Sequence, residues 1–217
     1  MLAFQSCSTN RFNDLIFANY IPAIYSAYHL LEEMQFHSLP IDIDDICKHL
    51  GIRVVLYSEA KDIIELLSLE KYCTCNHGVT IFSSGLGCPI ILVDDSLDKQ
   101  QQRFTIAHEI GHIFMSHRIS AFIKSDSIAS CPDIFEHAAD IFAISLLCPW
   151  VVLRRMNNIT YDGVASLCDV PMDCAKYSVD NMNSSDWLGL MFKYENLSRI
   201  LSAQFAYFVK KLSKKKE

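Results

Sequence analysis

The sequence predicts an α+β fold in which a small, mainly antiparallel sheet packs on helices, with a helical part at the C-terminus. Three short runs of β-branched and apolar residues lie between residues 52 and 93, as expected of short strands. Before and after these runs, apolar residues recur at intervals of three and four, which is typical of α-helices with one buried face. With 217 residues, 51% of them hydrophobic, the chain is long enough to bury a substantial core.

The first helices are predicted upstream of the strands. Between Asp14 and Phe36 apolar residues recur at helical intervals, which predicts either one helix or two helices separated at Pro22. A shorter helix is predicted from Asp42 to Leu50, because acidic residues stand in its first turn and Gly51 follows its last residue. The segment Ile52 to Tyr57 is predicted to be the first strand of the sheet.

A hairpin is predicted next, with strands Gly78–Phe82 and Pro89–Val93 joined by the glycine-containing loop Ser83–Cys88. One of these strands could be an exposed edge that binds an extended peptide by main-chain hydrogen bonds. An ordinary packed hairpin fits the same pattern, so the sequence leaves both interpretations open. The candidate caps for the helix that follows are Asp94, Asp95 and Ser96.

The segment Arg103–His112 contains the pattern His-Glu-x-x-His inside a predicted helix. Residues four apart lie on one face of a helix, so His108 and His112 can bind one metal ion while Glu109 projects beside it. Zinc binds neutral imidazole readily and lowers the pKa of a bound water to ~7, and a neighbouring glutamate can accept the proton. The pattern therefore predicts a zinc peptidase with Glu109 as its general base.

A catalytic zinc site needs a third protein ligand, and the best candidate lies on the next predicted helix, which ends at Pro149. Glu136 and Asp140 are four apart and share a face, so Glu136 can bind the metal while Asp140 accepts the outer N–H of a ligating histidine. His137 is a competing ligand, but as the neighbour of Glu136 it points about 100° away around the helix. We therefore rank Glu136 first.

Composition limits the compartment and the partners. The formal net charge is −6 and the main basic cluster is terminal, at Lys210–Lys216, so direct binding of nucleic acid is not expected. The N-terminus has no signal-peptide pattern, and the apolar stretch Ala138–Leu153, interrupted by Asp140 and Pro149, is too short to span a bilayer. Nine scattered cysteines fit reduced thiols in a cytoplasmic protein. Cys73, Cys75 and His77 lack the usual ligand spacing, so we interpret this cluster as a loop with free thiols.

The last third of the chain is predicted to be helical. Residues Tyr161–Tyr177 have the shape of two short helices around a turn, but they contain too few basic residues for DNA contacts, so a packing or substrate-docking unit is favoured. The segment Glu195–Leu212 forms an amphipathic helix for which core packing is favoured and a partner-binding surface is the alternative. We predict a metallopeptidase domain at residues 1–156 and a helical C-terminal region at residues 157–217.

The combined motifs resemble those of the ImmA/IrrE family of zinc metallopeptidases. The resemblance rests on Arg103–His112, followed by Glu136-x-x-Ala139-Asp140-x-Phe142-Ala143-x-x-Leu146-Leu147-x-Pro149, and it covers the middle half of the chain. It implies a zincin-like minimal fold, zinc bound by His108, His112 and Glu136, Glu109 as general base and then acid, and Asp140 in support. Asn is common in the family where this chain has Asp140, and the cysteine-rich stretch from Cys73 to Cys88 lies outside the matched motifs.

Members of this family typically cut DNA-binding repressors that carry a helix-turn-helix domain, and their genes occur in phages and other mobile elements. The resemblance therefore implies a zinc endopeptidase whose protein substrate is such a repressor. The alternative is a non-catalytic, zinc-binding regulator that binds a transcription factor, although such a protein would not need Glu109. The residue that stabilises the oxyanion stays open, with His117 and Tyr161 as candidates.

Overall fold

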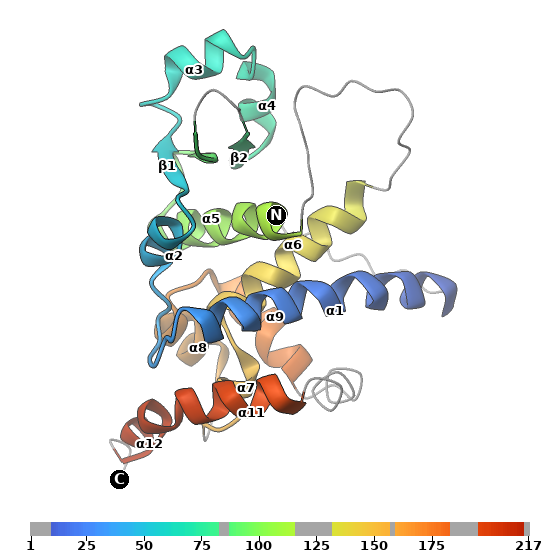
Figure 1. Cartoon of the computed structure of the whole chain (residues 1–217), viewed down its shortest axis with the longest axis vertical. Helices are drawn as coiled ribbons and strands as arrows, with labels where there is room; N and C mark the ends of the chain where they lie inside the picture. Colours follow the sequence, from blue (N-terminus) through green and yellow to red (C-terminus); the bar gives the residue numbers. More distant parts are fainter. Residues whose placement is uncertain (1–9, 83–86, 116–131, 157–158, 183–194, 215–217) are drawn as a thin grey trace.

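The computed structural model describes residues 10–82, 87–115, 132–156, 159–182 and 195–214. They form the predicted α+β fold, with a small sheet toward one end of a mainly helical structure (Figure 1). The elements in chain order are α1 (Asn10–Glu33), α2 (Ile43–His49), β1 (Arg53–Leu56), α3 (Lys61–Leu66), α4 (Glu70–Cys75), β2 (Gly78–Ile81), β3 (Ile90–Val93), α5 (Lys99–Phe114), α6 (Pro132–Leu147), α7 (Trp150–Leu153), α8 (Tyr161–Cys168), α9 (Met172–Met182), α11 (Glu195–Gln204) and α12 (Ala206–Lys214).

The first helix is a single helix that continues through Pro22. It packs along α6, and its fully buried residues Ala23, Ala27, Leu30 and Leu31 recur at the spacing of one helix face. Helix α2 begins at the predicted place because the Asp42 side chain accepts hydrogen bonds from the amides of Asp44 and Asp45. The sequence therefore predicted the type and position of both N-terminal helices.

The sheet has three strands in the order β1-β3-β2. The predicted hairpin is confirmed, since β2 and β3 are antiparallel with Gly78 opposite Val93 and Ile81 opposite Ile90. Strand β1 runs parallel to β3, so the sheet is mixed and the prediction of a mainly antiparallel sheet is wrong for this pair. The chain between β1 and β2 contains α3 and α4, which carry it across to the far side of β3.

Two local predictions around the sheet are also wrong. Cys73 and Cys75 lie in helix α4 rather than in a loop, although both are free thiols as predicted. Helix α5 is capped by Asp98, not by a residue of the segment 94–96, because Asp98 and Gln101 form a reciprocal capping box. Of the predicted hairpin loop, residues 83–86 lie outside the described part of the chain.

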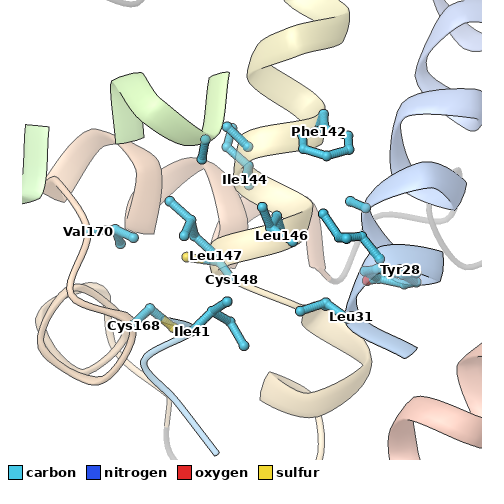
Figure 2. Close-up of a cluster of buried hydrophobic side chains, with 14 of the residues drawn as sticks. Tyr28, Leu31, Ile41, Phe142, Ile144, Leu146, Leu147, Cys148, Cys168 and Val170 are labelled. Carbon is cyan, nitrogen blue, oxygen red and sulfur yellow. The ribbon is translucent and has the colours of Figure 1, made fainter. Parts of the chain in front are cut away.

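The C-terminal helices pack against the rest of the core. Helices α8 and α9 form the predicted helix–turn–helix shape, and Cys168 and Val170 from this unit lie beside Leu147 and Cys148 of the α6–α7 segment (Figure 2). The segment after residue 194 is two helices, α11 and α12, rather than the one that was predicted. Its residues Leu197, Leu201 and Phe205 are buried, which confirms core packing for this part of the predicted amphipathic segment. The domain boundary at residue 156 stays a prediction.

The most apolar part of the chain is a core segment. By length and composition alone the stretch Phe135–Leu153 could cross a membrane, but 83% of it is buried inside the protein. Phe142, Leu146 and Leu147 on α6 are fully buried and lie among residues of α1 and of the C-terminal helices (Figure 2). Burial against these neighbours accounts for the apolar composition of the stretch.

Candidate active site

Helices α5 and α6 approach each other closely at Gly111. A Cβ atom at this position would lie 3.1 Å from Cδ1 and 3.2 Å from Cβ of Phe142, which is closer than ordinary van der Waals contact. On the α6 side of the contact, Ala139 and Ala143 are fully buried and add little bulk. Small residues on both helices therefore let the motif face of α5 meet the face of α6 that carries Glu136 and Asp140.

The three predicted metal ligands lie together where these faces meet. The Nε2 atoms of His108 and His112 are 3.0 Å apart. The carboxylate of Glu136 lies 3.2 Å from His108 Nε2 and 3.5 Å from His112 Nε2. Tetrahedral bonds of ~2.0–2.2 Å to nitrogen and oxygen would separate such ligand atoms by about 3.3–3.6 Å. The observed separations of 3.0, 3.2 and 3.5 Å come within about 0.3 Å of this range, so small side-chain shifts would let two imidazoles and a carboxylate bind one metal ion.

Asp140 contacts the opposite side of the His108 ring. Its Oδ1 lies 2.8 Å from His108 Nδ1, so Nδ1–H donates to the carboxylate and Nε2 faces the other two ligand atoms. This is the contact that the sequence predicted for Asp140. Within the described residues, the competing candidate His137 does not belong to the ligand group, and Cys73, Cys75 and His77 do not form a second group of three.

The electrostatics of the cluster favour a cation between the carboxylates. Burial lowers the pKa of His108, but hydrogen bonds to Asp140 and Glu136 outweigh this effect and raise its pKa to about 10. For Glu136, burial raises the pKa, but hydrogen bonds from His108 and His112 hold it well below its ordinary value. Without a metal ion, both ring nitrogens of His108 therefore carry protons at neutral pH. The resulting positive charge lies where a metal ion would otherwise supply it.

We expect the metal-free protein to lose stability as the pH rises from 7 to 10. The pKa of His108 is raised above its ordinary value of 6.5, so its contribution is fully present below 6.5 and is lost as the pH passes through about 10. In urea unfolding of chelator-treated protein, the free energy of unfolding should fall between pH 7 and pH 10. This fall should exceed that of the His108→Gln variant by at least ~1 kcal/mol. Equal decreases in the two proteins would contradict a protonated His108 in the metal-free site.

Glu109 lies beside the ligand group without belonging to it. Its side chain is buried, with the residue 8% exposed, and its Oε2 accepts a hydrogen bond of 2.6 Å from the hydroxyl of Thr80 on β2. A buried carboxylate next to a metal site can accept a proton from a bound water, as the sequence predicted. The structure thus brings the candidate base and the three candidate ligands together.

A cavity of about 450 Å³ opens over these residues. It is bounded by α4 and β2 on one side, by α5 and α6 at the ligand group, and by the start of α9. Apolar and polar side chains share its wall, among them Tyr72, His77, Phe82, Phe104 and Asp173. The size and mixed lining suit a segment of peptide rather than a small ion alone.

The sequence patterns do not predict that Tyr72 and Thr80 line this cavity, and they indicate His77 only as a weak candidate ligand. His77 Nδ1 lies 3.2 Å from Asp94 Oδ2, which orients the ring at the rim. Of the two candidates for the oxyanion role, Tyr161 donates a hydrogen bond to Asp180 and does not line the cavity. The other candidate, His117, lies outside the described residues.

Comparisons with known proteins identify relatives of this chain. Residues 47–177, which include the sheet and both helices of the ligand group, match the model of a peptidase family described as the IrrE N-terminal-like domain. Over 88 residues the chain is 33% identical to "Uncharacterized immunity region protein 2" of Bacillus phage phi105, covering 39% of this chain and 55% of that protein. Over 99 residues it is 27% identical to "Metallopeptidase ImmA" of Bacillus subtilis, covering 44% and 57%. The chain thus matches just over half the length of each of these curated relatives.

Proposed function

We propose that this chain, which belongs to the ImmA/IrrE family of metallopeptidases, is a zinc-dependent endopeptidase that cleaves a DNA-binding repressor or a similar regulator. The observation that carries the proposal is the convergence of ligand atoms from His108, His112 and Glu136 beside the buried carboxylate of Glu109. Two imidazoles and a carboxylate are the ligand set of one class of catalytic zinc sites. Zinc bound there would polarise the scissile carbonyl and make a bound water acidic enough to give up a proton near neutral pH.

The chain's own residues have separate tasks in this mechanism. Glu109 takes a proton from the attacking water and transfers it to the leaving amine. Asp140 orients His108 through its Nδ1–H, so the Nε2 lone pair stays available to the metal. In the described sheet β2 lies at the edge and lines the cavity, so an extended substrate segment could pair with it by main-chain hydrogen bonds.

The substrate class follows from the relatives and from the charge of the chain. One relative is named for a phage immunity region and another is named a metallopeptidase, which supports a protein substrate involved in immunity control. The family resemblance adds that such substrates are helix-turn-helix repressors. A formal net charge of −6 argues that the enzyme recognises the repressor itself rather than its DNA.

We propose Tyr72 as the donor of a hydrogen bond to the oxyanion. It lines the cavity, and burial together with the negative charges of Glu109 and Glu136 raises its pKa, so its hydroxyl stays protonated. Tyr72→Phe should lower kcat by about tenfold or more with little change in KM, because the donor acts mainly in the transition state. Steady-state cleavage kinetics would show this, and an unchanged kcat would exclude Tyr72 from the role.

The proposed function can be tested with the helix-turn-helix repressor encoded nearest to this chain's gene. Purified repressor incubated with the zinc-loaded protein should give two fragments on a gel, and mass spectrometry of the fragments would locate the cut. Addition of a chelator should stop the reaction. A stable complex without fragments, formed with zinc present, would instead favour the non-catalytic regulator.

A further inference from the structure

We propose that two residues of strand β2, Gly78 and Thr80, hold the carboxylate of Glu109 in place for proton transfer. In this arrangement Thr80 is a positioning residue that acts through Glu109, and Gly78 leaves the space for the contact. The proposal rests on the proposed peptidase function, in which Glu109 is the general base. It adds a task for the edge strand besides lining the cavity.

The contact between Thr80 and Glu109 has the properties of a strong hydrogen bond. The Thr80 hydroxyl donates to Glu109 Oε2 over 2.6 Å, within the range of ~2.5–2.7 Å that is typical of hydroxyl donors to an ionised carboxylate. Glu109 is buried, so its charge depends on protein partners rather than on bulk water. A donor fixed on a strand therefore limits the rotamers that the glutamate side chain can adopt.

The alternation of side chains along β2 explains why Thr80 points toward α5. Val79 and Ile81 are buried on the opposite face, in an apolar cluster that includes Leu92 of β3. Successive strand residues point to opposite faces, so Gly78 and Thr80 both face the helix that carries Glu109. The buried apolar face fixes which side of the strand faces α5, and so directs the Thr80 hydroxyl toward Glu109.

Gly78 lets the strand come close enough for this contact. A Cβ atom at Gly78 would lie 2.6 Å from Cγ2 of Thr105, and 3.0 Å and 3.1 Å from Oε1 and Cγ of Glu109. A side chain here would therefore push against both the helix and the carboxylate. The glycine backbone lies beside Oε1 of the carboxylate, and the Thr80 hydroxyl donates a hydrogen bond to the other oxygen, Oε2.

Accurate placement matters for a general base because proton transfer requires hydrogen-bond distance and alignment in the transition state. A catalytic group must be held within roughly 0.5 Å of its productive position by contacts that lock its rotamer. Loss of the Thr80 hydroxyl leaves the base present but less often correctly placed. The expected effect is thus on kcat, with little change in substrate binding or in metal content.

The test compares Thr80→Val, which keeps the shape and removes the hydroxyl, with Thr80→Ser, which restores the hydroxyl. Thr74→Val is the matched control, because the Thr74 hydroxyl bonds to the carbonyl of Glu70 in the exposed part of α4. With the labelled neighbouring repressor as probe, Thr80→Val should lower kcat about tenfold at nearly constant KM, whereas Thr80→Ser should stay within about threefold of wild type. Zinc content should be unchanged in every variant. A Thr80→Val protein with wild-type kcat would overturn the proposal.

A second measurement does not depend on activity. Urea unfolding at one fixed zinc concentration is measured for wild type, Thr80→Val, Glu109→Ala and the double variant. If the hydroxyl and the carboxylate interact, the effect of the double variant on the unfolding equilibrium constant should differ about tenfold from the product of the two single effects. A double-variant effect equal to that product would overturn the positioning contact. If the four proteins show this coupling but the wild type cleaves no repressor, the peptidase function would be contradicted while the contact would stand.

Discussion

Replacing Glu109 by Gln is expected to abolish cleavage while the protein keeps its zinc. The amide has nearly the same shape as the carboxylate but cannot accept a proton, so the loss in kcat should be about 10²–10⁴-fold. Glu109 is not part of the ligand group, so metal binding should not change. The amide oxygen can still accept the hydrogen bond from Thr80, so the fold around β2 and α5 should be preserved.

The measurement combines repressor cleavage with zinc analysis of the same protein sample. Glu65→Gln is the matched control, since Glu65 is an exposed residue of α3 and the same chemical change there should leave cleavage at the wild-type rate. Cleavage by Glu109→Gln at the wild-type rate would remove Glu109 from the role of base. Loss of zinc from the variant would show that this carboxylate also supports the metal.

The ligand group could be predicted from sequence because each half of it lies within one turn of a helix. His108 and His112 are four apart, as are Glu136 and Asp140, and helix geometry alone places each pair on a common face. In the structure the two pairs meet because α6 approaches α5 closely at Gly111. The family predicted from these residues is confirmed by the match over residues 47–177.

The residues that surround the base could not be predicted in the same way. Tyr72 and Thr80 lie on α4 and β2, more than twenty positions before Glu109. Thr80 contacts Glu109 because β2 packs on α5, and Tyr72 shares only the cavity wall with it. Helices α3 and α4 have six residues each, too few for a helical period to emerge from the sequence. Without them, the connection that places β1 parallel to β3 was not apparent.

One miss had a signal that the sequence did contain. Asp98 and Gln101 have the spacing of a capping box, with the N-cap residue three positions before a Glu or Gln. Asp94, Asp95 and Ser96 have suitable side chains too, but two of them are engaged elsewhere. Asp94 binds the amide of Ser96 and contacts His77, and Asp95 accepts hydrogen bonds from Ser58. Composition alone does not rank these candidates, whereas the capping-box spacing of Asp98 and Gln101 favours Asp98 as the N-cap.

Replacing Glu136 by Ala is expected to weaken zinc binding by more than about 100-fold and to abolish cleavage. Loss of a residue that only orients a ligand typically costs 10–100-fold in metal affinity, so loss of a ligand should cost more than about 100-fold. The two histidines alone would leave the ion with too few protein ligands for a catalytic zinc site. Competition with a chromophoric chelator would give the zinc affinity of each variant.

Asp140→Asn provides the graded comparison on the same helix face. Its amide oxygen can still accept the Nδ1–H of His108, so zinc affinity should fall by no more than about tenfold. If Glu136→Ala retained one tightly bound zinc, the third ligand would have to come from another residue, and His137 would be the first to replace. Because His137 points to a different side of α6 from Glu136, metal retention in this variant would also mean that the helix turns when zinc binds.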